Sequence, residues 1–207
     1  MEDILELLHQ RTIQNADMVC AMDYINPSDD NAMFYDVYIS RQINGHTFFP
    51  IPLNSSWDSW PLLFWNDPPT KSRYEAGQPF QVFSCWNGIT AFTAQPIMNS
   101  RVKFRSWFEG ECVAGEPTIL CKDLWYHGYG KIAVVPSVAV GYDDEKSAAI
   151  KKVKGTVSEW VAKERQDDED LLIEWKGPPE KVNCAPAWHA QHWVPWDDAL
   201  AANGVAP

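Results

Sequence analysis

The sequence predicts an α/β fold in which helices flank a mixed sheet. Residues 78–92 (QPFQVFSCWNGITAF) and 131–140 (KIAVVPSVAV) are strongly apolar and rich in aromatic and β-branched residues, as buried strands are. Apolar residues recur at helical spacing in residues 3–10 and 111–130. A length of 207 residues, of which 45% are hydrophobic, is enough for one domain with a substantial core.

After the first helix, the pattern predicts several short strands. Residues 16–22 (ADMVCAM) read as a strand that ends at Asp23, and residues 25–31 as a loop. Residues 34–43 alternate in polarity as a strand does, and residues 47–53 suit a proline-limited edge strand.

The middle of the chain predicts a long loop and one clear helix. Residues 54–77 hold three Trp and three Pro, and their aromatic content argues against disorder. Pro117 suits the first helical position, which places Glu116 near the N-cap of the helix within residues 111–130. Pro136 interrupts the strand at 131–140, so we expect an edge or a bulge there.

The C-terminal part predicts less order. Residues 143–160 read as a surface helix or loop, and the charge run at 163–170 (KERQDDED) as a solvated linker. Residues 177–207 show no periodicity and are interpreted as a tail of low order. We therefore expect a domain over residues 1–162 and a charged linker with a tail over 163–207.

The segment SCWNG within residues 78–92 has two interpretations. Trp86 offers a flat face and Asn87 a donor and an acceptor, so a core strand could surface here at the floor of a pocket. Asn87-Gly88 is equally a strong signal for a tight hairpin turn between the two halves of the run. The local pattern leaves both open.

Composition limits the partners. The formal net charge of −11 disfavours nucleic acid and anionic membrane surfaces. Eleven Trp suit sugar rings, although most are expected in the core. No apolar run approaches the roughly 20 residues that span a bilayer, and the acidic N-terminus is no signal peptide. The chain opens with a helix and no leading strand, which suggests that it is the later part of a longer protein.

The cysteines and histidines indicate no metal site. Five cysteines leave at least one thiol free, form no CxxC pair, and decide neither a reducing nor an oxidising compartment. Only His189 and His192 stand three apart, and they lie in the expected tail.

Several segments together resemble one family, the fungal α-1,3-mannosyltransferases of capsule polysaccharide synthesis (glycosyltransferase family 69). The match runs in order and spacing from about residue 2 to 157, and its most specific part is ECVAGEPTILCKDLWYHGYGKIAVVPSV at 111–138. Other matching pieces are ADMVCAMDY at 16–24, FYDVYISRQINGHTFF at 34–49, PFQVFSCWNGITAF at 79–92 and VKFR at 102–105. The chain departs from the family at Gly115, where Ser is usual.

The resemblance implies the later half of a nucleotide-sugar (GT-A-like) glycosyltransferase domain. It implies mannosyl transfer from GDP-mannose to a mannose-containing acceptor in α-1,3 linkage, a divalent metal (manganese or magnesium), and a place in the Golgi lumen. The family's first nucleotide-binding strands, its acidic metal motif and its membrane anchor precede the matched region, so we expect the metal ligands outside this chain. The alternatives are a non-catalytic carbohydrate-binding remnant without donor and metal sites, and a truncated product that folds poorly.

Candidate site residues follow from glycosyl-transfer chemistry and this resemblance. Such transfer needs a carboxylate to manage the acceptor hydroxyl or the developing positive charge, and polar or aromatic groups to hold the sugar. Glu116 is the first candidate for catalysis and Asp123 the second; their alternatives are helix capping and a surface ion pair. Candidates for substrate binding are Asp23, Asp36, Arg41, Trp86, Asn87 and Lys122. Asp36 and Arg41 would point to opposite faces of a regular strand, so a direct pair is not expected.

Overall fold

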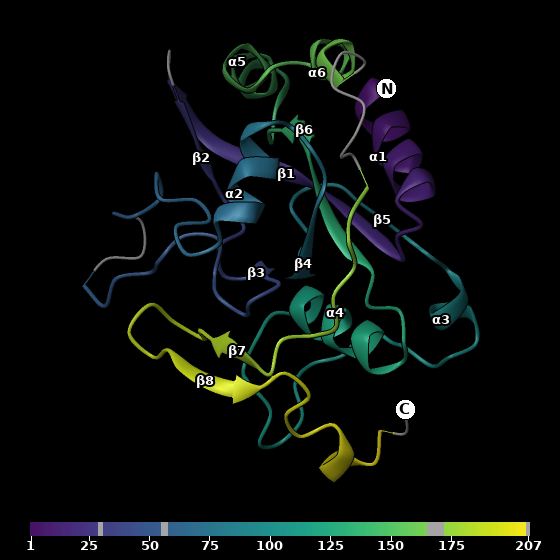
Figure 1. Cartoon of the computed structure of the whole chain (residues 1–207). Helices are drawn as coiled ribbons and strands as arrows, with labels where there is room; N and C mark the ends of the chain where they lie inside the picture. The colour runs from purple at the N-terminus through teal and green to yellow at the C-terminus, as the bar shows by residue number, and fades with distance from the viewer. Residues whose placement is uncertain (29–30, 55–57, 165–171, 206–207) are drawn as a thin grey trace.

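The computed structural model describes residues 1–28, 31–54, 58–164 and 172–205. Its centre is a mixed sheet in the order β2-β1-β6-β4-β3, in which β1 also pairs with β5 (Figure 1). The strands are β1 (Met18–Ser28), β2 (Asn31–Phe34), β3 (Arg41–Gln42), β4 (Phe80–Ser84), β5 (Thr90–Phe92) and β6 (Ile132–Val140). The predicted α/β class with a mixed sheet is confirmed.

The central pair of strands, β1 and β6, runs parallel and is buried on both faces. Because side chains alternate along a strand, Met18 and Cys20 enter one apolar core, whereas Val19 and Ala21 enter another on the opposite face. The pairing shifts register after Cys20, opposite the part of β6 that holds Pro136. The bulge expected at this proline is therefore confirmed.

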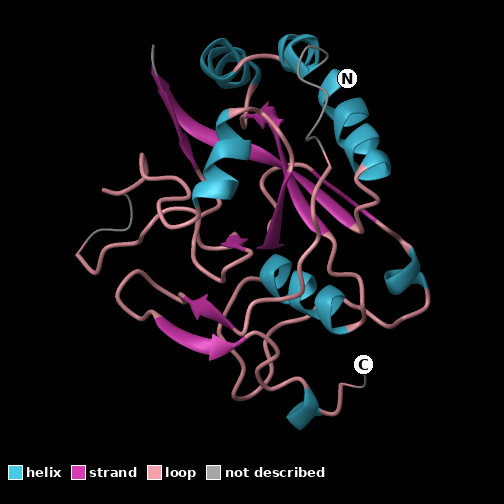
Figure 2. Cartoon of the chain, viewed as in Figure 1, coloured by secondary structure: helices cyan, strands magenta, loops and turns pink. Residues whose placement is uncertain are grey.

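Helices cover both faces and one end of the sheet (Figure 2). They are α1 (Glu2–Ile13), α2 (Pro68–Glu75), α3 (Gln95–Met98), α4 (Glu116–Tyr126), α5 (Asp144–Lys154), α6 (Val157–Glu164) and the short 3-10 helix η1 (Ala201–Asn203). α1 packs against β1, β5 and β6, α5 against β1, β2 and β6, and α4 against β4. Gly115 is the N-cap of α4, so Glu116 takes its first position and Pro117 its second.

The run at 78–92 divides into two strands with different partners. β4 pairs with β6 and β3, whereas β5 pairs with β1. The hairpin alternative is therefore wrong, and the interpretation of a central strand is confirmed. Asn87, which links the two strands, is fully buried.

Three local predictions in the first third of the chain are wrong. The expected loop at 25–31 is largely strand, because β1 continues to Ser28 and pairs back with β2. The expected strand at 34–43 breaks after Phe34 into turns, and only Arg41–Gln42 rejoin the sheet as β3. Residues 47–53 form no strand; the ring of Phe48 instead packs on Phe34 and Phe64.

The interpretation of residues 177–207 as a tail of low order is wrong for most of that segment. β7 (Lys181–Cys184) and β8 (His192–Pro195) form an antiparallel hairpin. A disulfide from Cys184 to Cys112 fastens it to the loop before α4. Of the predicted charged linker, residues 163 and 164 end α6, and 165–170 lie outside the described residues. In the described part of the chain, every helix is too short or too polar to cross a bilayer.

Candidate active site

The candidate site lies where β6 ends beside β1. Asp23 of β1 is paired with Val140, the last residue of β6, and Gly141 and Tyr142 follow directly. The carboxyl ends of neighbouring parallel strands are where open α/β sheets bind ligands. A pocket of about 280 Å³ opens here, and its lining includes Asp23, Gly88 and Tyr142.

Asp23 is a buried carboxyl group with a perturbed pKa. Its side chain is 1% exposed, and Oδ2 accepts a hydrogen bond from the Tyr142 hydroxyl at 2.5 Å. Oδ1 has no hydrogen-bond partner among the described residues. Burial and the nearby charge of Asp36 raise the pKa of Asp23 to about 7. A carboxyl group that titrates near neutral pH can both accept and donate a proton.

The second carboxyl group, Asp36, comes from the turn after β2. Its Oδ2 accepts a hydrogen bond from the backbone N–H of Asn87 at 2.9 Å, and burial raises its pKa. Its backbone carbonyl accepts from Ile39 and Ser40 at 3.2 and 3.0 Å, so the same residue also closes its own turn. Two carboxyl groups whose pKa values are raised in one place are typical of a functional site.

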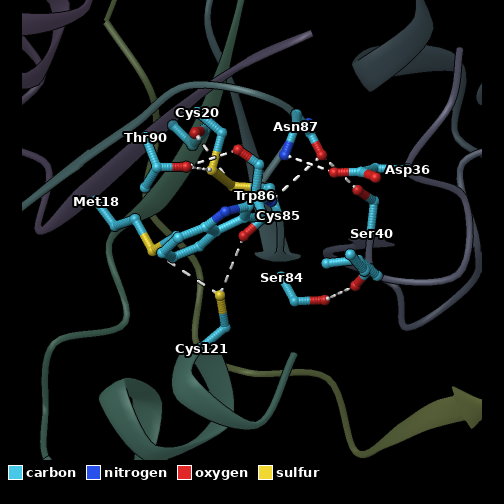
Figure 3. The surroundings of a disulfide bond; sticks show 12 residues. Met18, Cys20, Asp36, Ser40, Ser84, Cys85, Trp86, Asn87, Thr90 and Cys121 are labelled. Carbon is cyan, nitrogen blue, oxygen red and sulfur yellow. Dashed lines mark hydrogen bonds between the residues drawn. A yellow bond between two sulfur atoms is a disulfide. The ribbon is translucent and has the colours of Figure 1, made fainter. Parts of the chain in front are cut away.

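Asn87 lies beside Asp36 (Figure 3), and the next residue, Gly88, lines the pocket. Asn87 has a positive φ of 50°, and its Oδ1 accepts from Ser40 Oγ at 2.7 Å, while its buried Nδ2 has no partner in the described residues. Gly88 has a φ of 81°, and a Cβ there would lie 3.1 Å from that of Asp23. Only glycine lets the backbone come this close to Asp23.

A disulfide fixes the segment 86–88 to the sheet. Cys85, directly after β4, is bonded to Cys20 of β1 (Figure 3). Cys20 lies three residues before Asp23, and Cys85 lies two residues before Asn87. Trp86 between them is half-buried, and its ring meets Phe104 edge to face at 6.1 Å. The structure thus brings together Asp23, Asp36 and Asn87 of the predicted residues, with Trp86 as a neighbour of Asn87.

Arg41 stabilises the backbone next to the site. It is 2% exposed, and its guanidinium donates to the backbone carbonyls of Val37, Tyr38, Ser40 and Asn183. These bonds hold the turn that carries Asp36. Its role in substrate binding stays a prediction. A side chain so enclosed has little access to a substrate.

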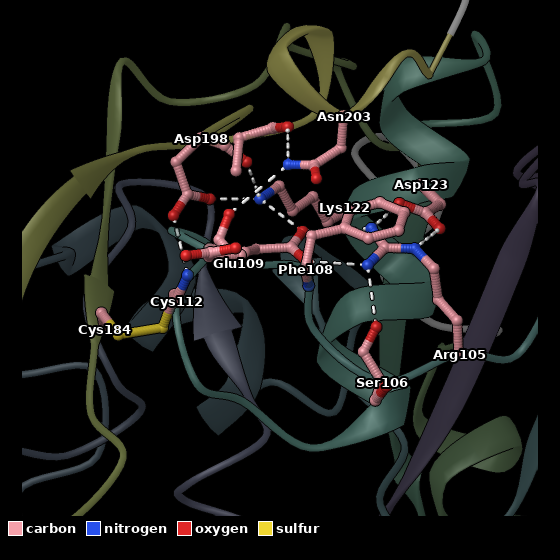
Figure 4. Close-up of polar contacts among 12 residues, drawn as sticks. Arg105, Ser106, Phe108, Glu109, Cys112, Lys122, Asp123, Cys184, Asp198 and Asn203 are labelled. Atoms are coloured by element: carbon pink, nitrogen blue, oxygen red, sulfur yellow. Dashed lines mark hydrogen bonds and ion pairs between the residues drawn. A yellow bond between two sulfur atoms is a disulfide. The ribbon is translucent and has the colours of Figure 1, made fainter.

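Asp123 and Lys122 belong to a different, buried ion-pair cluster (Figure 4). Arg105 donates to Asp123 at 2.7 and 2.8 Å and to Glu111 at 2.7 and 3.0 Å. Lys122 pairs with Glu111 at 2.8 Å and with Asp198. The alternative of a surface ion pair is wrong for Asp123, because this residue pairs with Arg105 but is only 5% exposed. The proposed roles of Asp123 and Lys122 at substrate stay predictions.

Glu116 is exposed at the first turn of α4, as predicted from Pro117. It is not among the residues that line the pocket at Asp23. Its catalytic role stays a prediction. Sequence reasoning missed Tyr142, although the rule that selected Asp23, a polar side chain where a strand ends, applies equally to the residues after β6.

The described residues do not form a complete metal site. No group of three or more His, Cys, Asp or Glu side chains is placed to hold an ion in the ranges the structure covers. Asp23 Oδ1 is an unpartnered acceptor, and two carboxylates hold a magnesium ion only together with substrate phosphates and water. Four of the five cysteines are in disulfides, and Cys121 is buried.

Comparison with known proteins gives two matches. Residues 1–123 match the family model described as Cryptococcal mannosyltransferase 1. The chain is also similar to the alpha-1,3-mannosyltransferase CMT1 of Cryptococcus neoformans var. neoformans serotype D, with 35% identity over 213 residues. That alignment covers 94% of this chain and 45% of the relative, so the chain spans less than half of the relative's length. No solved structure matches the chain.

Proposed function

Because the chain belongs to the family described as Cryptococcal mannosyltransferase 1, we propose that it acts in mannosyl transfer from GDP-mannose to a mannose-containing acceptor, in α-1,3 linkage. The observation that carries the proposal is the buried carboxyl group of Asp23, which faces a pocket at the carboxyl end of β6, where this strand lies parallel to β1. The mixed α/β sheet is compatible with a GT-A-like domain, which we propose as its fold type.

Asp23 is the group we assign to the acceptor. Its carboxylate would take the proton of the acceptor hydroxyl or stabilise the positive charge that develops on the transferred sugar. The acceptor hydroxyl would replace the Tyr142 hydroxyl as the donor to Asp23 Oδ2. Tyr142 is 59% exposed, so its side chain has room to leave.

Asp36 and Asn87 have positioning roles in this proposal. The charge of Asp36 helps to keep the pKa of Asp23 near neutral, where a proton acceptor works well at cellular pH. Asn87 donates its backbone N–H to Asp36, and its buried Nδ2 donor has no partner in the described residues.

The donor and the metal are proposed from the family resemblance. A divalent metal would neutralise the leaving diphosphate, and we propose that its ligands lie largely outside the described residues. The two disulfides are typical of proteins that fold in an oxidising compartment, which supports a proposed location in the Golgi lumen. A role in capsule polysaccharide synthesis is proposed from the family resemblance.

A second candidate is carbohydrate binding without transfer. It is favoured by the half-exposed indoles of Trp65, Trp107 and Trp193, whose flat faces suit sugar rings. Calorimetry with GDP-mannose and manganese separates the two, because a binding remnant would bind a mannoside but not the nucleotide sugar.

The experiment for the leading proposal is a transfer assay with radiolabelled GDP-mannose and a mannobiose acceptor. Asp23→Asn is expected to reduce turnover by on the order of 10²-fold or more, since it removes the proton acceptor. Asp58→Asn, at an exposed loop position, is the matched control and should leave turnover unchanged. Equal turnover in the Asp23 variant and the control would refute the role of Asp23.

A further inference from the structure

Three aromatic side chains form an exposed cluster on the hairpin side of the molecule. The ring centroid of His46 lies 5.5 Å from that of Trp65 and 4.6 Å from that of Trp193, and both contacts are edge to face. Trp65 is 39% and Trp193 44% exposed. We call Trp65, His46 and Trp193 the indole platform. It presents large apolar faces to solvent, although such side chains are usually covered.

The hydrogen-bonding state of these indoles differs from that of three tryptophans elsewhere in the chain. The Nε1 groups of Trp125, Trp160 and Trp175 donate to backbone carbonyls at 2.9, 2.8 and 3.1 Å. Within the ranges the structure describes, Trp65 and Trp193 make no such bond. Their N–H donors are available to a ligand, so these indoles are not acting as hydrogen-bonded anchors of the core.

The platform is held in place by the fold. Trp193 lies on β8, whose partner strand β7 is bound to the turn before His46: Asn183 donates to the carbonyl of Gly45 at 2.9 Å. Arg41 donates to the carbonyl of Asn183 at 2.6 Å, and the disulfide from Cys184 to Cys112 fixes the end of β7. Binding to a surface that is already ordered costs little conformational entropy.

We propose that the indole platform is a binding subsite for a neutral saccharide chain. Pyranose rings would lay their C–H faces on the two indoles, and ring hydroxyls would accept from the free N–H groups and bond to His46. The formal net charge of −11 opposes an anionic ligand, and the platform itself contains no lysine or arginine. The choice of mannose as the sugar rests on the proposed function.

The subsite is separate from the pocket at Asp23. Figure 1 shows the β7–β8 hairpin at the opposite end of the molecule from α5, which follows the end of β6. The platform would therefore hold a part of a long glycan distant from the reacting hydroxyl. Longer saccharides should bind more tightly than a disaccharide, because only they can extend along the surface.

The test titrates the ¹⁵N-labelled chain with α-linked manno-oligosaccharides of increasing length and follows the indole N–H signals by NMR. Trp65→Ala and Trp193→Ala should each weaken binding at least about tenfold, and Trp193→Phe should lose less. Trp107→Ala, at another half-exposed tryptophan, is the control and should bind as the unaltered chain does. Circular dichroism verifies that each variant is folded.

The outcomes separate this subsite from the proposed catalysis. Asp23→Asn should keep saccharide binding even if it abolishes transfer. Absence of binding to any neutral oligosaccharide at millimolar concentration, or equal binding by the two platform variants and the control, would overturn the proposal. So would a concentration-dependent dimer that the platform substitutions dissociate without any effect on saccharide, since the platform would then join two copies of the chain.

Discussion

Tyr142 donates its phenolic hydrogen to Oδ2 of Asp23 at 2.5 Å, and thereby joins an exposed residue after β6 to a buried carboxyl group in β1. The bond favours the charged form of Asp23, whereas burial and the charge of Asp36 disfavour it. The balance leaves the pKa of Asp23 at about 7. Both the stability and the proposed chemistry of the protein should therefore respond to this one contact.

The first prediction concerns stability in Asp23→Asn. The pKa of Asp23 is raised above its ordinary value of 3.8, so its contribution to stability is present at low pH and is lost as pH rises through about 7. The variant removes this loss, and its free energy of unfolding at pH 8 should exceed that of the unaltered chain. Linkage limits the gain to about 4 kcal/mol, reduced by any new unsatisfied amide.

Urea unfolding from pH 4 to pH 8 measures this effect. The curves of the two proteins should converge near pH 4 and separate as pH increases. A variant that is less stable than the unaltered chain at pH 8 would show that Asp23 stabilises the fold in its charged form, contrary to this prediction.

The second prediction concerns Tyr142→Phe. Loss of the hydroxyl removes a bond that lowers the pKa of Asp23, so that pKa should rise above about 7. NMR titration of the ¹³C-labelled carboxyl groups measures it directly. If Asp23 accepts the acceptor proton, the acid limb of the pH profile of kcat/KM, which reports the free enzyme, should move to higher pH by the same amount.

Tyr126→Phe is a matched control, because Tyr126 lies on α4 and makes ring contacts with His127 and Trp196 instead. It should leave the titration of Asp23 where it is. A Tyr142 variant that titrates like this control would mean that the hydrogen bond contributes nothing to the pKa.

The third prediction concerns the disulfide between Cys20 and Cys85. Replacing both by Ser opens a link across 65 residues and should cost about 2–5 kcal/mol of unfolding free energy. Because the bond fixes the start of the Trp86-Asn87-Gly88 turn, amide hydrogen exchange at Asn87 should accelerate more than in a variant without the Cys112–Cys184 disulfide. Equal exchange in both variants would contradict a local role.

The strands that sequence predicted correctly are those with a strong local signal. Half of the residues at 131–140 are β-branched, and the bulge at Pro136 follows from its missing N–H. The strand expected at 34–43 failed because its alternating pattern reflects buried turns, in which Ser40 and Arg41 bond to other segments. The hairpin at 181–195 depends on a distant disulfide, which no local pattern reveals.

The sequence indicated three residues of the candidate site but not that they would lie together. Asp23, Asp36 and Asn87 were selected because they are polar groups at strand ends or within an apolar run. Their meeting depends on strand order, which places β1 next to β6 and allows β4 and β5 to part at Asn87. The buried position of Asp123 was equally hidden, because it depends on Arg105 from a loop without regular structure.

The fourth prediction concerns the buried ion-pair cluster. Lys122→Met should cost about 3–5 kcal/mol of unfolding free energy, because it leaves the carboxylates of Glu111 and Asp198 without this cation. Lys71→Met, in an exposed pair with Glu75, should cost less than about 0.5 kcal/mol. Similar losses in urea unfolding of both variants would argue that the cluster is not a structural element.

The last prediction compares two carboxyl groups in the transfer assay. Glu116 occupies the first position of α4, and its side chain is exposed to solvent. If Glu116 acts in acid–base chemistry, as the family resemblance implies, Glu116→Gln should reduce turnover by on the order of 10²-fold with little change in stability. If Asp23 is the reacting group, only Asp23→Asn should do so. A double variant that is no slower than the slower single variant would place both in one step. Full turnover in Glu116→Gln would reduce Glu116 to a residue of the helix terminus.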